Sequence, residues 1–268
     1  MQGPSREALR AASEASRAVA ATDPQVVGQE LLAVATLLGA QTSLRNALTD
    51  NGATPERRLT LAAQVFQGKV TPPTLSVISS AVAQRWSRPR DLTEALEEMG
   101  ADALLAHAEQ DGRIDAVEEQ LFRFSRLIES SSDLQILLSN PAVPDATKAA
   151  VTGDLLAGRA EPETSTLVDH VVSHPAGRRV THRLDELVEL AAQRREQLLA
   201  DVRAPVGLTE AQQTRLAAAL TRIYGRPVTL AVSVDPSLLG GAVVRVGDEI
   251  IDGSVASRLA TTRRTLTQ

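Results

Sequence analysis

The feature that most constrains this chain is an internal repeat with an offset of 90 residues. An apolar pattern with the three- and four-residue spacing of an amphipathic helix occurs in both copies. Its members are Val27, Leu31, Val34 and Leu38, which return as Val117, Leu121, Phe124 and Ile128. Gly68 returns as Gly158, where a helix is expected to end on a left-handed residue. Because the correspondence extends over five successive helical patterns, we interpret it as a duplicated all-helical module.

The helices of both copies are predicted from apolar period and from breaker residues. The first copy is expected to hold helices near 5–20, 24–40, 43–49, 55–67, 73–86 and 90–110, and the second near 115–130, 133–139, 145–157, 163–173 and 178–200. Asp23-Pro24 and Thr54-Pro55 place a capping residue before a proline at the first helical position. No breaker occurs before Gly112, so one helix is expected to end the first copy and begin the second.

The pattern changes after about residue 198. Residues 200–204 and 228–234 alternate between apolar and polar side chains, which predicts strands with one buried face. Thr209 and Gln212 form a capping box that opens a helix, Gly247-Asp248 predicts a tight hairpin, and residues 255–266 predict a final helix. The predicted fold is therefore mainly α, with two tandem helical-bundle domains (1–100 and 101–197) followed by a small α+β domain (198–268).

Composition and charge argue against several classes of protein. The absence of cysteine excludes disulfides, a thiolate nucleophile and thiolate metal sites. A net charge of −5 and only five aromatic residues argue against nucleic-acid binding. The longest apolar stretch, 31–40, is about half of the roughly 20 residues that a spanning helix requires. Without an export signal at the N-terminus, we expect a cytoplasmic chain that reaches a membrane only through a partner.

The sequence offers few candidates for catalysis or metal binding. His170 and His174 have the spacing that places two imidazoles on one helix face, as in some zinc sites. No glutamate follows the first histidine and Pro175 ends the helix, so polar residues at a helix end are the favoured interpretation. Glu97-Glu98 and Glu118-Glu119 are adjacent carboxylates whose side chains diverge by about 100°, which favours solvated helix faces.

Two motifs near the C-terminus are also better explained by structure than by chemistry. Gly240-Gly241 precedes a predicted strand rather than a helix, so a close backbone approach is favoured over a phosphate loop. Ser254 lacks the glycine elbow of serine hydrolases and is predicted to cap a helix. We therefore predict no catalytic residue, no cofactor and no metal ligand.

Surfaces for partners remain. Apolar side chains on the shared helix and on the fifth helix of the second copy are predicted to line a groove for an amphipathic partner helix. These residues are Leu104, Leu105, Ala108, Leu167, Val168 and Val171. The alternative is that all six are ordinary core residues.

Three segments carry a resemblance to a known family. Residues 234–259 read VDPSLLGGAVVRVGDEIIDGSVASRL, residues 113–121 read RIDAVEEQL, and residues 138–144 read LSNPAVP. Together they resemble the δ subunit of F-type ATP synthases, whose mitochondrial counterpart is the oligomycin-sensitivity-conferring protein. The resemblance covers residues 101–268, and residues 1–100 look like an extra copy of the N-terminal helical domain in front, as in long members of the family.

The resemblance implies a stator subunit that performs no catalysis. In the family, the N-terminal domain holds N-terminal helices of the α subunits, and the C-terminal domain holds the b-subunit stalk. Rotor torque then drives ATP synthesis, on the cytoplasmic face of the cell membrane, where the chain would be peripheral. The matching motif residues are expected to fix turns and a helix cap in the stalk-binding domain; they are Asp235, Pro236, Gly240, Gly241, Gly247, Asp252, Gly253 and Ser254.

The second copy precedes the C-terminal domain directly, so it is the predicted head-docking copy. The first copy is open to three interpretations: it holds a second α helix, braces the stalk, or contacts a b-like partner. Two other classes of protein are alternatives to a stator subunit. A helical-repeat adaptor for another amphipathic helix leaves the C-terminal motif unexplained, and an enzyme would need a carboxylate or histidine site that the sequence does not display.

Overall fold

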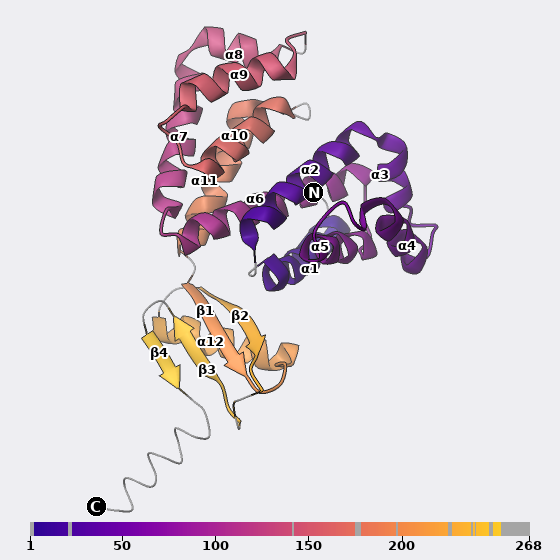
Figure 1. The fold of residues 1–268 in the computed structure, drawn as a ribbon, viewed down its shortest axis with the longest axis vertical. Coiled ribbons are helices and arrows are strands. Elements are labelled where there is room, and N and C mark those ends of the chain that lie inside the picture. The colour runs from indigo at the N-terminus through magenta and orange to yellow at the C-terminus, as the bar shows by residue number, and fades with distance from the viewer. Residues whose placement is uncertain are drawn as a thin grey trace, which may run out of the picture. The chain divides into compact units, whose positions relative to one another are not determined.

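The structure is a computed structural model. The structure describes residues 3–20, 23–140, 142–174, 178–196, 198–224, 227–236, 238, 240–246 and 249–252. The chain divides into two compact units, Met1–Ala192 and Gln193–Gln268. The first is all helical and the second is α+β, so the predicted fold class is confirmed (Figure 1).

The first half of the helical unit contains α1 (Gly3–Ala20), α2 (Pro24–Ala40), α3 (Thr42–Leu48), α4 (Pro55–Phe66) and α5 (Pro72–Ala83). Three of these helices begin with proline, whose fixed φ suits the first helical position. The Asp23 carboxylate accepts a hydrogen bond from the Val26 N–H at 3.3 Å, which confirms the predicted cap of α2. Thr54 precedes α4 as predicted, but its side chain makes no capping hydrogen bond.

Helix α6 (Pro89–Gln110) is shared by the two halves, as the absence of a breaker before Gly112 predicts. The second half continues with α7 (Ile114–Ser130), α8 (Ser132–Ser139), α9 (Asp145–Leu156), α10 (Pro162–Ser173) and α11 (Val180–Glu196). The bounds of α2, α4 and α5 return in α7, α9 and α10 with the offset of 90 residues, so the repeat is structural. Gly68 and Gly158 both follow a helix with positive φ, 76° and 66°.

Two clusters of buried apolar side chains hold the helical unit together. One lies in the first half and includes Phe66 and Trp86, and the other lies mainly in the second half and includes Leu121 and Phe124. Helix α2 packs along α6 at very short range (Figure 1). A Cβ atom placed on Gly28 would lie 2.7 Å from Leu104 Cγ, so only glycine permits this approach.

The second unit contains β1 (Leu198–Ala204), α12 (Glu210–Tyr224), β2 (Val228–Val234), β3 (Val243–Val246) and β4 (Glu249–Asp252). The strand order is β2-β1-β3-β4, with β1 and β2 parallel and the other two pairings antiparallel. Helix α12 connects the parallel pair and lies on one face of the sheet (Figure 1). Ala200, Val202 and Ala204 are buried on the central strand β1, as their alternation predicts.

The structure also corrects three expectations for this region. The helix predicted over 178–200 ends at Glu196, because the strand pairing of β1 begins at Leu198. In β2, Val228, Leu230 and Val232 belong to or pack against the core of the α+β unit as their alternation predicts, but Val234, at the end of this edge strand, is 56% exposed. Ile223, predicted on the buried face of its helix, is exposed.

The predicted hairpin is present, since Val246 pairs with Glu249. Its turn residues, Gly247 and Asp248, lie outside the described residues, as does the predicted final helix over 255–266.

Candidate functional site on the shared helix

The six predicted groove residues lie in the second apolar cluster, and none is more than 2% exposed. They are Leu104, Leu105, Ala108, Leu167, Val168 and Val171. Leu104 additionally meets α2 of the first half at Gly28. In this conformation the six side chains hold helices together, the packing role that the alternative interpretation assigns to them.

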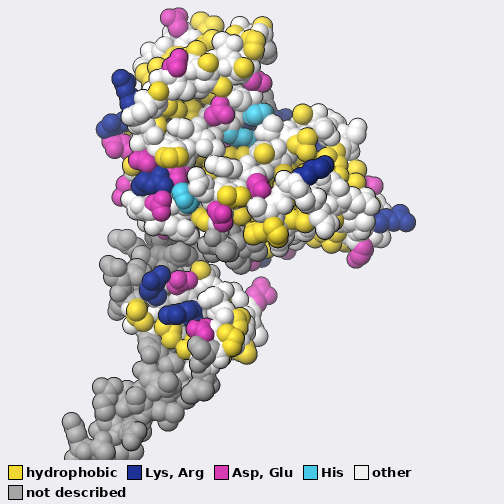
Figure 2. Space-filling view, viewed as in Figure 1, with side chains coloured by type: hydrophobic (Ala, Val, Ile, Leu, Met, Phe, Trp, Pro, Cys, Tyr) yellow, Lys and Arg dark blue, Asp and Glu magenta, His cyan; other side chains and the backbone are white. Residues whose placement is uncertain are grey.

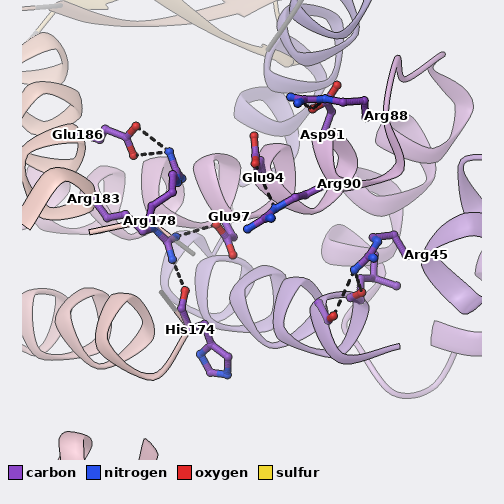
Figure 3. Close-up of polar contacts among 12 residues, drawn as sticks. Arg45, Arg88, Arg90, Asp91, Glu94, Glu97, His174, Arg178, Arg183 and Glu186 are labelled. Atoms are coloured by element: carbon purple, nitrogen blue, oxygen red, sulfur yellow. Dashed lines mark hydrogen bonds and ion pairs between the residues drawn. The ribbon is translucent and has the colours of Figure 1, made fainter. Parts of the chain in front are cut away.

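Buried charges link α6 to α10 and α11 in the middle of the helical unit (Figure 3). The Glu97 carboxylate accepts a hydrogen bond from Arg183 Nη2 at 2.7 Å and lies 3.6 Å from His170 Nε2. Arg183 also donates through Nη1 to the backbone carbonyl of His174. The His170 and His174 rings stack with their centroids 5.3 Å apart. Glu97 and Arg183 are almost completely buried, so each charge depends on the other for compensation.

The pKa values of this cluster follow from burial and from the paired charges. Burial acts to raise the pKa of Glu97, but the neighbouring His170 and the charge of Arg183 outweigh it and hold the pKa below its ordinary value. Burial lowers the pKa of Arg183. Burial, and then the nearby charge of His170, lower the pKa of His174, which favours the neutral imidazole.

A second cluster lies at the other end of the contact between α6 and α10. Glu163 is 1% exposed and accepts hydrogen bonds from Arg113 Nη1 at 2.6 Å and Nη2 at 2.9 Å. His107 Nδ1 lies 2.6 Å from Glu163 Oε1. Burial acts to raise the pKa of Glu163, but the hydrogen bonds from Arg113 and His107 lower it overall, and the pKa of Arg113 is raised by the same pairing.

The two clusters show how α6 and α10 are joined. His107 meets Glu163 near the start of α10, whereas Glu97 meets His170 near its end, so the two helices run antiparallel. Four of the predicted groove residues, Leu104, Leu105, Leu167 and Val168, lie on the helix segments between these bridges, and Ala108 and Val171 lie one residue beyond them. Because each bridge uses a buried carboxylate, separating the helices would leave a buried charge without its partner.

Sequence reasoning missed this arrangement and placed Glu97 on a solvated face. Glu97 is only 9% exposed, whereas its neighbour Glu98 is exposed. The available signal was the spacing, since Glu97 lies seven residues before Leu104 and therefore on the same apolar face of α6. A carboxylate on an apolar helix face predicts a buried partner.

The histidine pair shows no geometry for a metal ion. His170 faces Glu97 and stacks on His174, and the described residues contain no group of three or more potential metal ligands. None of the helices in the described ranges is long and apolar enough to cross a bilayer. On the face of the helical unit seen in Figure 2, acidic and basic side chains are interspersed.

The C-terminal motif lies around the entry to β3. The Asp235 N–H donates to the Ala204 carbonyl at 2.8 Å, and the turn continues through the exposed Pro236. Gly240 and Gly241 have φ values of 152° and 80°, a backbone region that favours glycine, and a strand rather than a helix follows them.

The other motif residues are at the edge of the described chain or beyond it. Asp252 ends β4. Gly247, Gly253 and Ser254 lie outside the described residues.

Fold and site together define a helical-repeat protein with a separate α+β unit, in which buried polar clusters join the helices. Residues 96–266 match the family model "ATP synthase delta (OSCP) subunit". An ATP synthase subunit delta of Nocardia farcinica is 50% identical over 98% of this chain and 96% of its own length. The subunit delta of Parafrankia is 41% identical over 100% of this chain and 100% of its own length. The subunit delta of Streptomyces coelicolor is also 41% identical, over 99% of this chain and 98% of its own length.

Among solved structures, a chain of the Toxoplasma gondii mitochondrial ATP synthase hexamer matches with a TM-score of 0.29 and 21% identity, over 63% of this chain and 95% of that chain.

The chain belongs to the ATP synthase delta (OSCP) subunit family. It is a peripheral-stalk subunit of an F-type ATP synthase and not a catalytic subunit. The first 95 residues lie outside the family model but are included in the alignments with full-length relatives.

Proposed function

We propose that this subunit ties the α/β head of the synthase to its b-subunit stalk on the cytoplasmic face of the membrane, so that rotor torque drives ATP synthesis. In this proposal the chain has three parts: an extra helical bundle (1–100), a head-docking bundle (101–197) and a stalk-binding domain (198–268). The membrane is reached only through the complex, and nucleic acid is not a partner.

The extent of the family match carries this proposal. The family model spans the second helical half and the α+β unit, and these fall into separate compact units of the chain. Two units with separate cores suit a linker that must hold two partners at once.

We propose that N-terminal helices of the α subunits dock on the pair α6 and α10 of the second half. This is where the six residues Leu104, Leu105, Ala108, Leu167, Val168 and Val171 lie. Because these side chains are buried, docking through them requires α6 and α10 to separate, against the ionic bridges at Glu97 and Glu163. A helix that docks without such a separation would contact only the outer surfaces of α6 and α10.

Three structural features support a bracing role for the first half. It shares α6 with the second half, and Gly28 on α2 packs against Leu104 without room for a Cβ atom. Glu97, in the N-terminal part of α6, pairs with Arg183 on the last helix of the second half. These contacts make the first half a stiff extension of the second.

The test is a titration of the full chain, with labelled methyl groups, with a peptide taken from the N-terminus of the α polypeptide. Shift changes at the Leu104, Leu167 and Val171 methyls, with faster amide exchange in α6 and α10, would show docking with separation of the helices. Changes confined to α1–α5 would assign the head to the first half, and the absence of any change would reject docking through this chain. A peptide taken from the C-terminus of the stalk polypeptide b is expected to affect only residues 198–252.

A further inference from the structure

A pocket of about 760 Å³ lies in the second half of the helical unit, away from the seam between α6 and α10. Its walls come from α7, α8, α9 and the start of α11. Apolar wall is supplied by Ile128, Leu138 and Val180, and positive charge by Lys148, Arg178 and Arg179. This size is within the range of pockets that hold a small ligand or a large side chain.

Lys148 is the unusual member of this wall, because it is a lysine only 3% exposed. Within the described part of the chain its ammonium donates no hydrogen bond, and the one acidic oxygen in ion-pair range is Asp145 Oδ1 at 3.9 Å. The Asp145 side chain is itself 61% exposed, so this pairing is weak. A buried ammonium normally has a close anionic or carbonyl partner.

The other charges of the pocket leave a positive excess. The Arg178 guanidinium pairs with Glu186 at 2.8 and 3.0 Å, and the pocket's one acidic residue, Glu129, pairs with Arg126 outside it. Arg179 is exposed and pairs with none of the acidic side chains that the structure describes. The unbalanced groups are therefore Lys148 and Arg179, which suits a carboxylate.

In the first half, the basic residue at the repeat position of Lys148 has hydrogen-bond partners within the chain. Arg58 is the repeat counterpart of Lys148 and is also 3% exposed. It donates to the carbonyls of Gln84 at 2.7 Å and Ala83 at 3.2 Å, the last carbonyls of α5. In the second half, the carbonyl of His174 receives its hydrogen bond from α11 instead, so Lys148 is released from this role.

The apolar side chains around this repeat position also differ between the two halves. In the first half, the loop after α5 supplies Trp86, which is 2% exposed. Its cluster includes Leu38 and Leu48, the counterparts of Ile128 and Leu138 in the pocket. The corresponding loop of the second half, residues 174–179, contains no tryptophan, tyrosine or phenylalanine. In the first half the two leucines thus share a buried cluster with an indole of the same chain, whereas in the second half their counterparts line a pocket.

We propose that this pocket binds a segment of a partner protein in which an aromatic side chain stands next to a carboxylate. The aromatic ring packs on Ile128 and Leu138, whose counterparts share a buried cluster with Trp86 in the first half, and the carboxylate pairs with Lys148. This site is independent of the proposed docking on α6 and α10, and it holds whether or not that docking is correct.

The test uses two probes that differ only in charge, N-acetyltryptophan with a free carboxylate and N-acetyltryptophanamide without one. Each is titrated into the full chain while the methyl resonances of Ile128, Leu138 and Val180 are followed. We expect N-acetyltryptophan to shift these methyls with a dissociation constant of about 1 mM. The amide is expected to bind about tenfold more weakly, because the charge-assisted hydrogen bond is lost.

Lysine substitutions supply a matched control, because the chain contains only two lysines. Lys148→Met is expected to weaken N-acetyltryptophan binding about tenfold. Lys69→Met, at an exposed position in the first half, is expected to bind as the native chain does.

Three results would overturn the proposal: no methyl shift at about 10 mM probe, equal affinity for both probes, or shifts that map elsewhere. If Lys148→Met fails to fold, the comparison of the two probes on the native chain still decides.

Discussion

The close contact between α2 and α6 at Gly28 allows a quantitative prediction for Gly28→Ala. The added Cβ would lie 2.7 Å from Leu104 Cγ and 2.9 Å from the Gly100 carbonyl oxygen, and the backbone oxygen has little freedom to move. Overpacking of this kind costs about 1–3 kcal/mol, while alanine gains about 1 kcal/mol over glycine in helix propensity. We therefore expect the free energy of unfolding of the first half to fall by up to about 2 kcal/mol.

The assay is urea unfolding of the full chain followed by the fluorescence of Trp86, the single tryptophan, which is buried in the first half. Gly39→Ala is a matched control on the same helix, because a Cβ there meets no atom within 4 Å. Gly39→Ala is expected to increase the free energy of unfolding by up to about 1 kcal/mol and so to raise the urea midpoint. A midpoint for Gly28→Ala that rises as much as that of Gly39→Ala would refute the argument that α2 and α6 require glycine at this contact.

Three further predictions concern the buried ionic clusters. The pKa of Glu97 in the folded chain is below its ordinary value of 4.5, so the stability that the Glu97 carboxylate contributes is complete above pH 4.5 and is lost as the pH falls through the folded-state pKa. Glu97→Gln should therefore reduce the loss of stability at acid pH in urea titrations between pH 3 and 6. Because the pKa of His174 is lowered in the folded chain, His174 is protonated at higher pH in the unfolded chain than in the folded one. Stability should therefore fall as the pH drops below 6.5, and it should fall less steeply in His174→Gln. Equal pH dependence of stability in the native chain and in His174→Gln would contradict this. Glu163→Gln should destabilise the second half by about 3 kcal/mol in thermal unfolding, whereas Glu119→Gln, in an exposed pair, should cost less than about 1 kcal/mol; equal effects would show that Glu163 is not the buried partner described.

Much of the helical fold was predictable because it depends on local signals. The repeat places helix starts at proline and helix ends at Gly68 and Gly158, and most observed bounds fall within two residues of those expected. The errors came where a neighbouring strand decides the outcome. Helix α11 stops at Glu196 because β1 must pair, and Val234 is exposed because it lies at the end of β2, an edge strand.

The candidate site was harder to predict, because its residues come from helices far apart in the sequence. Glu97 and Arg183 are 86 residues apart, and no local pattern connects them. Apolar periodicity identifies a buried face, but it does not say whether a second helix of the same chain or a partner covers that face. Leu104 illustrates the difference, because the covering helix is α2 of the other repeat.

Duplication explains why the two halves, built alike, differ in what they can bind. In each half the fourth helix places a basic side chain, Arg58 or Lys148, at the same buried position. In the first half, Arg58 donates to backbone carbonyls of the same half, and Trp86 of the following loop is buried, so this half supplies both groups itself. The second half satisfies the corresponding carbonyl with Arg183, and the same arginine compensates Glu97. Arg183 thus fixes the contact between α6 and α11 and leaves Lys148 with only its weak pairing to Asp145. This links the stiffness of the shared helix to the availability of the pocket.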